Sequence, residues 1–216
     1  MPTGATTNGH AGRAAVAGEP EERTRYRFAA WKDARWNSFD RQRERYEVIR
    51  PYLGHDAVGA ELGVYKGGFG EFLLPHCRKL YLVDPWFRLG GYWQSGLKQD
   101  ARVDTVIEIL TVYREEISAG QVEVVIDWAK NFLRGIRDRW FDFLYVDSSH
   151  SYEQTLDELA AALPKMKSGG IITGDDYDPD PASNQHGVYR AVNEFAAAHR
   201  LELVFAKSRQ WGLRAR

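Results

Sequence analysis

Short apolar runs alternate with amphipathic segments along most of the chain. The apolar runs predict β-strands at residues 57–63, 79–83, 122–126, 141–146 and 171–173, and apolar residues at helical spacing predict helices at 68–75, 103–117, 152–163 and 188–199. Strands that alternate with helices imply a parallel sheet with both faces covered. Two further runs, 201–205 and 210–213, predict a closing hairpin. We therefore expect an α/β fold with a seven-stranded, mostly parallel sheet, one antiparallel strand and helices on both faces.

The first fifty residues differ from this pattern. Residues 1–20 are rich in Ala, Gly and Thr and hold almost no large apolar side chain, so we expect a disordered tail. Residues 21–54 mix arginines with aromatic side chains, and Phe39, Tyr46 and Ile49 fall near one face of a helix. We interpret this segment as a helix that packs on the core and keeps a solvated charged face. The alternative is a lid or dimer element over the active site.

Composition narrows the class of protein. A length of 216 residues suits one α/β domain, which we assign to residues 55–216. The net charge of −1 gives no basic excess for nucleic acid or an anionic membrane. No apolar run approaches the roughly 18 residues of a membrane span, and the start of the chain lacks a signal-peptide layout. A single cysteine, Cys77, excludes an intrachain disulfide and fits a reducing compartment. We expect a soluble, cytoplasmic protein.

A glycine-rich turn follows the first predicted strand, in the sequence Glu61-Leu-Gly-Val-Tyr-Lys-Gly-Gly-Phe-Gly70. Glycine permits positive φ and close approach to a ligand, and a strand-to-helix turn directs free N–H groups outward. A nicotinamide fingerprint would read G-x-G-x-x-G, with its acidic residue after the next strand. Here the acid comes first, as E-x-G-x-x-x-G-x-x-G, which resembles the first motif of class I S-adenosylmethionine (SAM) methyltransferases. SAM carries a sulfonium and an ammonium group, so an acidic residue in this turn is electrostatically favourable.

Carboxylates stand at one predicted strand end after another. In open α/β sheets the ligand lies outside the carboxyl ends of the strands. Asp84 ends the strand after the glycine turn, where its carboxylate can accept hydrogen bonds from both ribose hydroxyls of SAM. Asp127 has two interpretations, a helix cap or a cofactor contact. The remaining three are Asp147, Asp175 and Asp176.

These last three aspartates predict a metal site. Two adjacent strands would bring Asp147, Asp175 and Asp176 into one small volume, where their mutual repulsion is unfavourable. A hard divalent cation with oxygen ligands, Mg²⁺ above all, relieves that repulsion. The alternative is that all three are turn residues and helix caps.

Two histidines are candidates for the general base. His150 lies three residues beyond Asp147, on the turn that enters the next helix. Its ordinary pKa suits proton transfer at neutral pH, although a cap or a solvated histidine is also consistent with this position. His186 lies in the polar loop that follows Asp176, and we rank it second.

Three motifs carry a family resemblance. Tyr145-Val-Asp-Ser-Ser-His-Ser-Tyr-Glu153, Pro164-Lys-Met-Lys-Ser-Gly-Gly170 and Gly174-Asp-Asp-Tyr177 resemble the D-x-x-H-S-Y-E, P-x-x-x-x-G-G and D-D-Y motifs of a bacterial class I methyltransferase family related to macrocin-type sugar O-methyltransferases. The resemblance spans about residues 56–205 and implies a Rossmann-like fold. The aspartate spacing also matches the metal ligands of catechol-type O-methyltransferases, which carry a lysine base where this chain has His150. Ser148-Ser149 replaces the Gly-Asp that is more usual in the family.

The resemblance and the residues together predict a SAM-dependent, divalent-metal-dependent O-methyltransferase acting on a hydroxyl of a small molecule. A sugar of a bacterial secondary metabolite or glycan is the first acceptor class, and a catechol-like phenol is the second. The alternatives are a metal-independent methyltransferase and a catalytically silent SAM-binding protein. The residues assigned to catalysis are His150 and Asp147, and those assigned to the cofactor are Glu61, Gly63, Tyr65, Gly67, Asp84, Asp127 and Trp128. No nucleic-acid or membrane partner is expected, and the sequence leaves open whether the chain forms a homo-oligomer.

Overall fold

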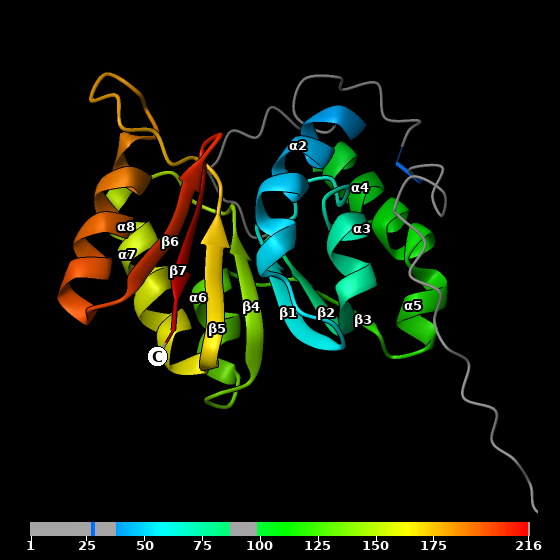
Figure 1. Ribbon diagram of the computed structural model, residues 1–216. Coiled ribbons are helices and arrows are strands. Elements are labelled where there is room, and N and C mark those ends of the chain that lie inside the picture. The colour runs from blue at the N-terminus through cyan, green and yellow to red at the C-terminus, as the bar shows by residue number, and fades with distance from the viewer. Residues whose placement is uncertain (1–26, 29–37, 87–98, 216) are drawn as a thin grey trace, which may run out of the picture.

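The structure is a computed structural model that describes residues 27–28, 38–86 and 99–215 (Figure 1). Five strands alternate with helices before the last long helix: β1 (Ala57–Leu62), β2 (Cys77–Val83), β3 (Val122–Val125), β4 (Phe141–Val146) and β5 (Met166–Gly174). Two more follow the last helix, namely β6 (Glu202–Lys207) and β7 (Gln210–Arg214). The described helices longer than three residues are α2 (Phe39–Ile49), α3 (Gly70–Leu73), α4 (Gln99–Val112), α5 (Arg114–Ser118), α6 (Ala129–Gly135), α7 (Tyr152–Ala162) and α8 (His186–His199).

All seven of these strands join one sheet, in the order β3-β2-β1-β4-β5-β7-β6. The first five strands are parallel, and β7 runs antiparallel between β5 and β6. The predicted Rossmann-like fold of mostly parallel strands with one antiparallel strand is therefore confirmed.

The strand register brings the predicted site residues to one edge of the sheet. The last residue of β1, Leu62, pairs with Val83 of β2 and with Val146 of β4. Val146 in turn pairs with Gly174 of β5. The residues that follow these strand ends therefore leave the sheet side by side, as expected for a ligand site in a parallel sheet.

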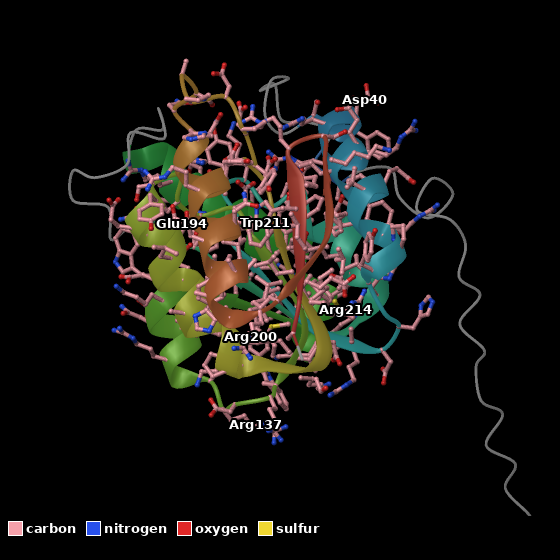
Figure 2. All side chains as sticks on the ribbon, turned by 60° about the vertical axis from the view of Figure 1, so that its left-hand side comes forward. Asp40, Arg137, Glu194, Arg200, Trp211 and Arg214 are labelled. Carbon is pink, nitrogen blue, oxygen red and sulfur yellow. The ribbon has the colours of Figure 1, made fainter. Side chains whose placement is uncertain are left out.

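Helices cover both faces of the sheet, as Figure 1 shows. Buried residues of α6, α7 and α8 pack on one face, and those of α2, α3 and α4 pack on the other. Trp211 of β7 is fully buried in the first of these two hydrophobic clusters (Figure 2). In the same view Asp40, at the start of α2, and Arg137, in the loop before β4, lie at opposite ends of the molecule. The start of α2 therefore lies at the carboxyl edge of the sheet.

Helix α2, the described helix of the N-terminal segment, packs on the core. Ser38 caps α2 by accepting a hydrogen bond from the backbone N–H of Arg41. Tyr46 and Ile49 are buried, and the Tyr46 ring lies 5.4 Å from that of Phe72 in α3. The tail predicted at residues 1–20 lies outside the described residues. None of the helices that the structure describes combines the length and hydropathy that a bilayer crossing needs.

The structure departs from the expected helices in two places. The helix expected at 103–117 is two helices, α4 and α5, which meet at Tyr113. The Tyr113 side chain is fully buried and its hydroxyl donates to the backbone oxygen of Gly67, a tertiary contact that the local pattern does not reveal. The short helix α6 was not predicted, because its three buried apolar residues span too few turns for a periodic signal.

Candidate active site

The glycine-rich turn lies directly against the end of β4. Gly63 has a φ of +89°, and a Cβ at this position would approach the backbone oxygen of Asp147 to 2.1 Å. Gly67 also has positive φ, at +86°, and Tyr65 between them has a φ of +52°. Glycine is required at Gly63 both by conformation and by space. The turn predicted to hold SAM therefore touches the strand that carries the first aspartate of the predicted metal site.

Asp84 holds this turn in place. Its Oδ2 accepts hydrogen bonds from the backbone N–H groups of Val64 and Tyr65, at 3.0 and 2.9 Å. Its Oδ1 accepts from the N–H of Trp86, whose indole in turn donates to the Tyr65 oxygen. Burial raises the pKa of Asp84 against the opposing effect of these backbone donors. The carboxylate lies beside the turn. Its Oδ2 already accepts two backbone N–H groups, so Oδ1, which accepts one, is the oxygen with a lone pair left for a ribose hydroxyl.

Glu61, at the end of β1, is a buried acid with an unsatisfied oxygen. The residue is 2% exposed, and its Oε2 has no hydrogen-bond partner among the described residues. Burial raises the pKa of Glu61 well above its usual range, and the nearby charge of Asp147 adds to the rise. A buried polar atom without a partner is rare in folded proteins and calls for an explanation. A cationic ligand group that donates a hydrogen bond would satisfy it, which fits the ammonium of SAM.

Asp127 and Trp128 lie where β3 leads into α6. The Asp127 Oδ1 accepts hydrogen bonds from the Trp128 backbone N–H at 2.8 Å and from the Asn131 side chain at 3.2 Å. Trp128 is the N-cap residue of α6, and this helix has no side-chain cap hydrogen bond, so Asp127 binds the residue at the helix start without capping the helix. Trp128 is 38% exposed. Their assignment to the cofactor stays a prediction.

Asp147, Asp175 and Asp176 come together as the sequence predicts. Each offers a carboxylate oxygen, and these oxygens all lie within 4.8 Å of one another. We call these three residues the acidic triad. Asp176 has a φ of +67°, a left-handed conformation that aspartate tolerates better than most residues. Burial raises the pKa of Asp147, and Asp175 and Asp176 add to the rise. The donor set, three carboxylates with oxygen ligands, suits a hard divalent cation.

The sequence reasoning missed the arginines that pair with the acidic triad. Arg45 of α2 lies 2.8 Å from Asp147 through Nη1 and forms an ion pair with Asp175 through Nη2. Arg41, one helical turn earlier, lies 3.6 Å from Asp175. Arg209, in the turn between β6 and β7, lies 2.8 Å from Asp176. The i, i+4 spacing of Arg41 and Arg45 is the one signal in the sequence that places both on one helix face.

Asp175 is also held by hydrogen bonds that involve β7 and β4. Its Oδ1 accepts a hydrogen bond of 2.5 Å from the Gln210 side-chain amide, and Gln210 accepts one of 2.8 Å from the Tyr145 hydroxyl. The Trp211 indole donates to the Asp175 backbone oxygen at 3.0 Å. Buried polar groups linked in this way hold one geometry, because each partner satisfies the next.

The two candidate bases have different neighbours. The His150 Nδ1 lies 2.5 Å from the Asp176 Oδ2, and this hydrogen bond raises the pKa of His150. Burial by itself would raise the pKa of Asp176. The hydrogen bond from His150 and the charges of His150 and Arg209 outweigh burial and lower the pKa of Asp176. His186 begins α8, where its Nδ1 lies 3.3 Å from the Asp178 backbone oxygen and its ring stacks on Tyr189. His150 is thus the histidine that contacts the acidic triad directly.

Comparisons with known proteins bear on the family and the fold of the chain. Residues 60–177 match the model of a methyltransferase domain family. No curated protein shows a significant match to the chain. A solved structure of the Podospora anserina methyltransferase PaMTH1 with bound S-adenosylhomocysteine (SAH) is similar, with a TM-score of 0.58, 14% identity and coverage of 88% of this chain and 85% of that one.

Two further solved structures are similar in fold. The O-methyltransferase NovP has a TM-score of 0.53 and 20% identity, with 82% of this chain and 78% of that chain covered. The N-methyltransferase NodS from Bradyrhizobium japonicum has a TM-score of 0.54 and 15% identity, with 81% and 96% covered. At these identities the likeness concerns the fold.

Proposed function

The chain belongs to this methyltransferase domain family, and from that premise we propose that it transfers the methyl group of SAM to a hydroxyl oxygen of a small molecule. The observation that carries the proposal is the contact between the glycine turn and the acidic triad. A Cβ on Gly63 would lie 2.1 Å from the backbone oxygen of Asp147. A methyl donor held by the turn and an acceptor held at the acidic triad would therefore be neighbours.

We assign the donor site to residues around the turn. Glu61 would face the positive groups of SAM, and Asp84 would accept hydrogen bonds from its ribose. The transfer forms a bond between the acceptor oxygen and the methyl carbon and breaks the bond from that carbon to sulfur, leaving SAH. Because the sulfonium is already activated, the protein contributes chiefly the alignment of the two partners.

We assign the acceptor side to the acidic triad and His150. Asp147, Asp175 and Asp176 would hold a divalent metal, with Mg²⁺ the best match to carboxylate ligands, and such a metal lowers the pKa of a bound hydroxyl. Asp176 contacts the His150 Nδ1 and so orients the ring. The other ring nitrogen, Nε2, would take the proton that the acceptor hydroxyl loses.

The proposed acceptor is a sugar hydroxyl of a bacterial secondary metabolite or glycan, with a catechol-like phenol second. This acceptor class rests on the sequence motifs around Asp147 and Asp176. A screen of SAM consumption over glycosides, phenols and amines tests it. Methylation of an amine with no turnover of any hydroxyl acceptor would contradict O-methylation, and SAH binding without turnover on any acceptor would favour a silent SAM-binding protein.

One observation favours a second candidate, a metal-independent methyltransferase. Arg41, Arg45 and Arg209 already pair with the acidic triad, so the negative charge that a cation would balance has partners within the protein. An assay of protein dialysed against EDTA, with and without added Mg²⁺, separates the two candidates. Full activity without metal would leave the acidic triad with a structural role.

A further inference from the structure

Arg45 takes up the position between two carboxylates of the acidic triad. Its two terminal nitrogens reach different aspartates, Asp147 at 2.8 Å and Asp175, in an ion pair with each. The residue is only 9% exposed. These same two carboxylates supply two of the three oxygens that lie within 4.8 Å of one another. The guanidinium therefore binds two of the three carboxylates that a divalent cation would need.

The helix that carries Arg45 is attached to the protein by other residues. Tyr46 and Ile49 are buried against the core, and the Tyr46 hydroxyl lies 2.9 Å from the His76 Nε2. Because these contacts do not involve the guanidinium, α2 keeps its anchorage when Arg45 changes partners. The Arg45 Nε is buried and has no hydrogen-bond partner among the described residues. The guanidinium is thus not fully satisfied where it lies, which is unfavourable for a permanent buried ion pair.

A cation and this guanidinium exclude each other. Sharing Asp147 and Asp175 as ligands would hold a dication and a guanidinium within a few ångströms, where like charges repel strongly in a partly buried site. Arg41 differs in this respect, because it lies 3.6 Å from Asp175 and its other ion pair is with Glu44, outside the acidic triad. Of the arginines that contact the acidic triad, Arg45 is the one that the structure shows bridging two of its members.

We propose that Arg45 and a divalent cation are alternative occupants of the acidic triad, so that Arg45 sets the cation affinity and withdraws before the cation binds. The inference rests on the metal site of the proposed function. It adds that the N-terminal helix supplies a built-in counter-ion, which keeps the acidic triad paired until a cation replaces it.

The test is a calorimetric titration of the full chain with Mn²⁺, in the absence of SAM and acceptor. Arg45→Gln should bind Mn²⁺ about tenfold or more tightly than the unaltered chain, equivalent to losing a competitor worth about 1.4 kcal/mol. Arg43→Gln removes the same charge from an exposed position of α2. Its Mn²⁺ affinity should stay within about twofold of that of the unaltered chain, because solvent and salt screen exposed charges. Arg41→Gln removes a charge near Asp175 without removing the bridge, and should have an effect clearly smaller than that of Arg45→Gln.

A second measurement covers the case in which Arg45→Gln folds poorly, since it leaves two carboxylates without their arginine. Arg45→Lys keeps the charge but loses the two-pronged guanidinium, and should bind Mn²⁺ more tightly than the unaltered chain. Mn²⁺ should also raise the melting temperature of either variant more than that of the unaltered chain, because binding to the folded state stabilises it.

The outcomes separate this inference from the proposed function. Equal Mn²⁺ affinity in the unaltered chain and both Arg45 variants, or an equal gain from Arg41→Gln, would overturn the inference and leave the metal site standing. If neither the unaltered chain nor the variants bind Mn²⁺, the inference and the metal site both fail. Methyl transfer is then still measurable in EDTA, so the methyltransferase activity is tested independently.

Discussion

The His150 imidazole and the Asp176 carboxylate lie 2.5 Å apart, between Nδ1 and Oδ2, although one follows β4 and the other follows β5. A carboxylate on one ring nitrogen fixes the orientation of the ring and directs the second nitrogen away from it. This is the arrangement expected of a histidine that accepts a proton from a substrate. It also couples the charge of His150 to that of the acidic triad.

We expect His150→Ala to lower kcat by about 10²- to 10⁴-fold while leaving SAH affinity nearly unchanged, because a general base acts only on the acceptor. His186→Ala is the matched control and should keep near-normal kcat. The measurement is steady-state kinetics at several pH values with an acceptor found in the screen. A normal rate in His150→Ala together with a large loss in His186→Ala would place the base at the first residue of α8.

The pKa of His150 should fall when its partner loses its charge. In the metal-free protein the Asp176 hydrogen bond raises the pKa of His150, so the imidazolium persists to a higher pH than in an ordinary histidine. Asp176→Asn removes the negative charge and should shift the titration of His150 to lower pH. NMR of the labelled imidazole measures this directly, and an unchanged titration would show that Asp176 does not control the ring.

Asp84→Asn should weaken SAM and SAH binding about tenfold, because hydrogen bonds to a charged acceptor contribute about 1.5 to 3 kcal/mol. Asparagine keeps one oxygen for the turn N–H groups and so limits the damage to the turn. Asp138→Asn is the matched control. Asp138 lies in the loop before β4, where it is exposed and forms an ion pair with Lys165. Calorimetry with SAH measures both variants, and equal affinities would refute the ribose assignment of Asp84.

Substitutions in the acidic triad should weaken metal binding more than they weaken SAM binding. Asp175→Asn and Asp176→Asn should each raise the Mg²⁺ concentration for half-maximal activity more than the KM for SAM. Asp176→Asn should be the milder change, because a neutral carbonyl oxygen remains a competent ligand. Activity that is independent of Mg²⁺ and insensitive to chelation would show that the acidic triad does not hold a catalytic metal.

Glu158 of α7 should make the protein less stable as the pH rises. Burial raises its pKa to about 7, against the opposing hydrogen bond from Ser148 at 2.6 Å. The folded state therefore holds the Glu158 proton more tightly than the unfolded state. The stability that this proton contributes is fully present below about pH 4.5 and is lost as the pH rises toward 7.

Glu158→Gln keeps an acceptor oxygen for Ser148 and carries no charge at any pH. At pH 8 it should be more stable than the unaltered chain by up to about 3 kcal/mol, and the advantage should shrink in acid. Glu153→Gln, exposed on the same helix, should stay within about 0.5 kcal/mol. Urea unfolding at pH 5 and pH 8 measures the difference, and a pH-independent effect of Glu158→Gln would contradict this origin.

The sequence by itself determined the order of the strands and of most helices, and the edge at which the site lies. Both follow from local information: apolar runs mark buried strands, and in a parallel sheet every strand ends at the same edge. Asp147 and Asp175 could therefore be placed side by side without coordinates, and the glycine pattern located the neighbouring turn at Gly63.

Only the tertiary structure decided what balances the charge of that site. Arg45 and Asp147 are 102 positions apart, and Arg209 reaches Asp176 from a hairpin turn 33 positions later. No local pattern encodes such pairs, because they depend on how α2 and the β6–β7 turn pack over the sheet edge. The prediction of repulsion among the three aspartates therefore left out their arginine partners. The positions of the aspartates follow from the strand ends, whereas the positions of the arginines follow from tertiary packing.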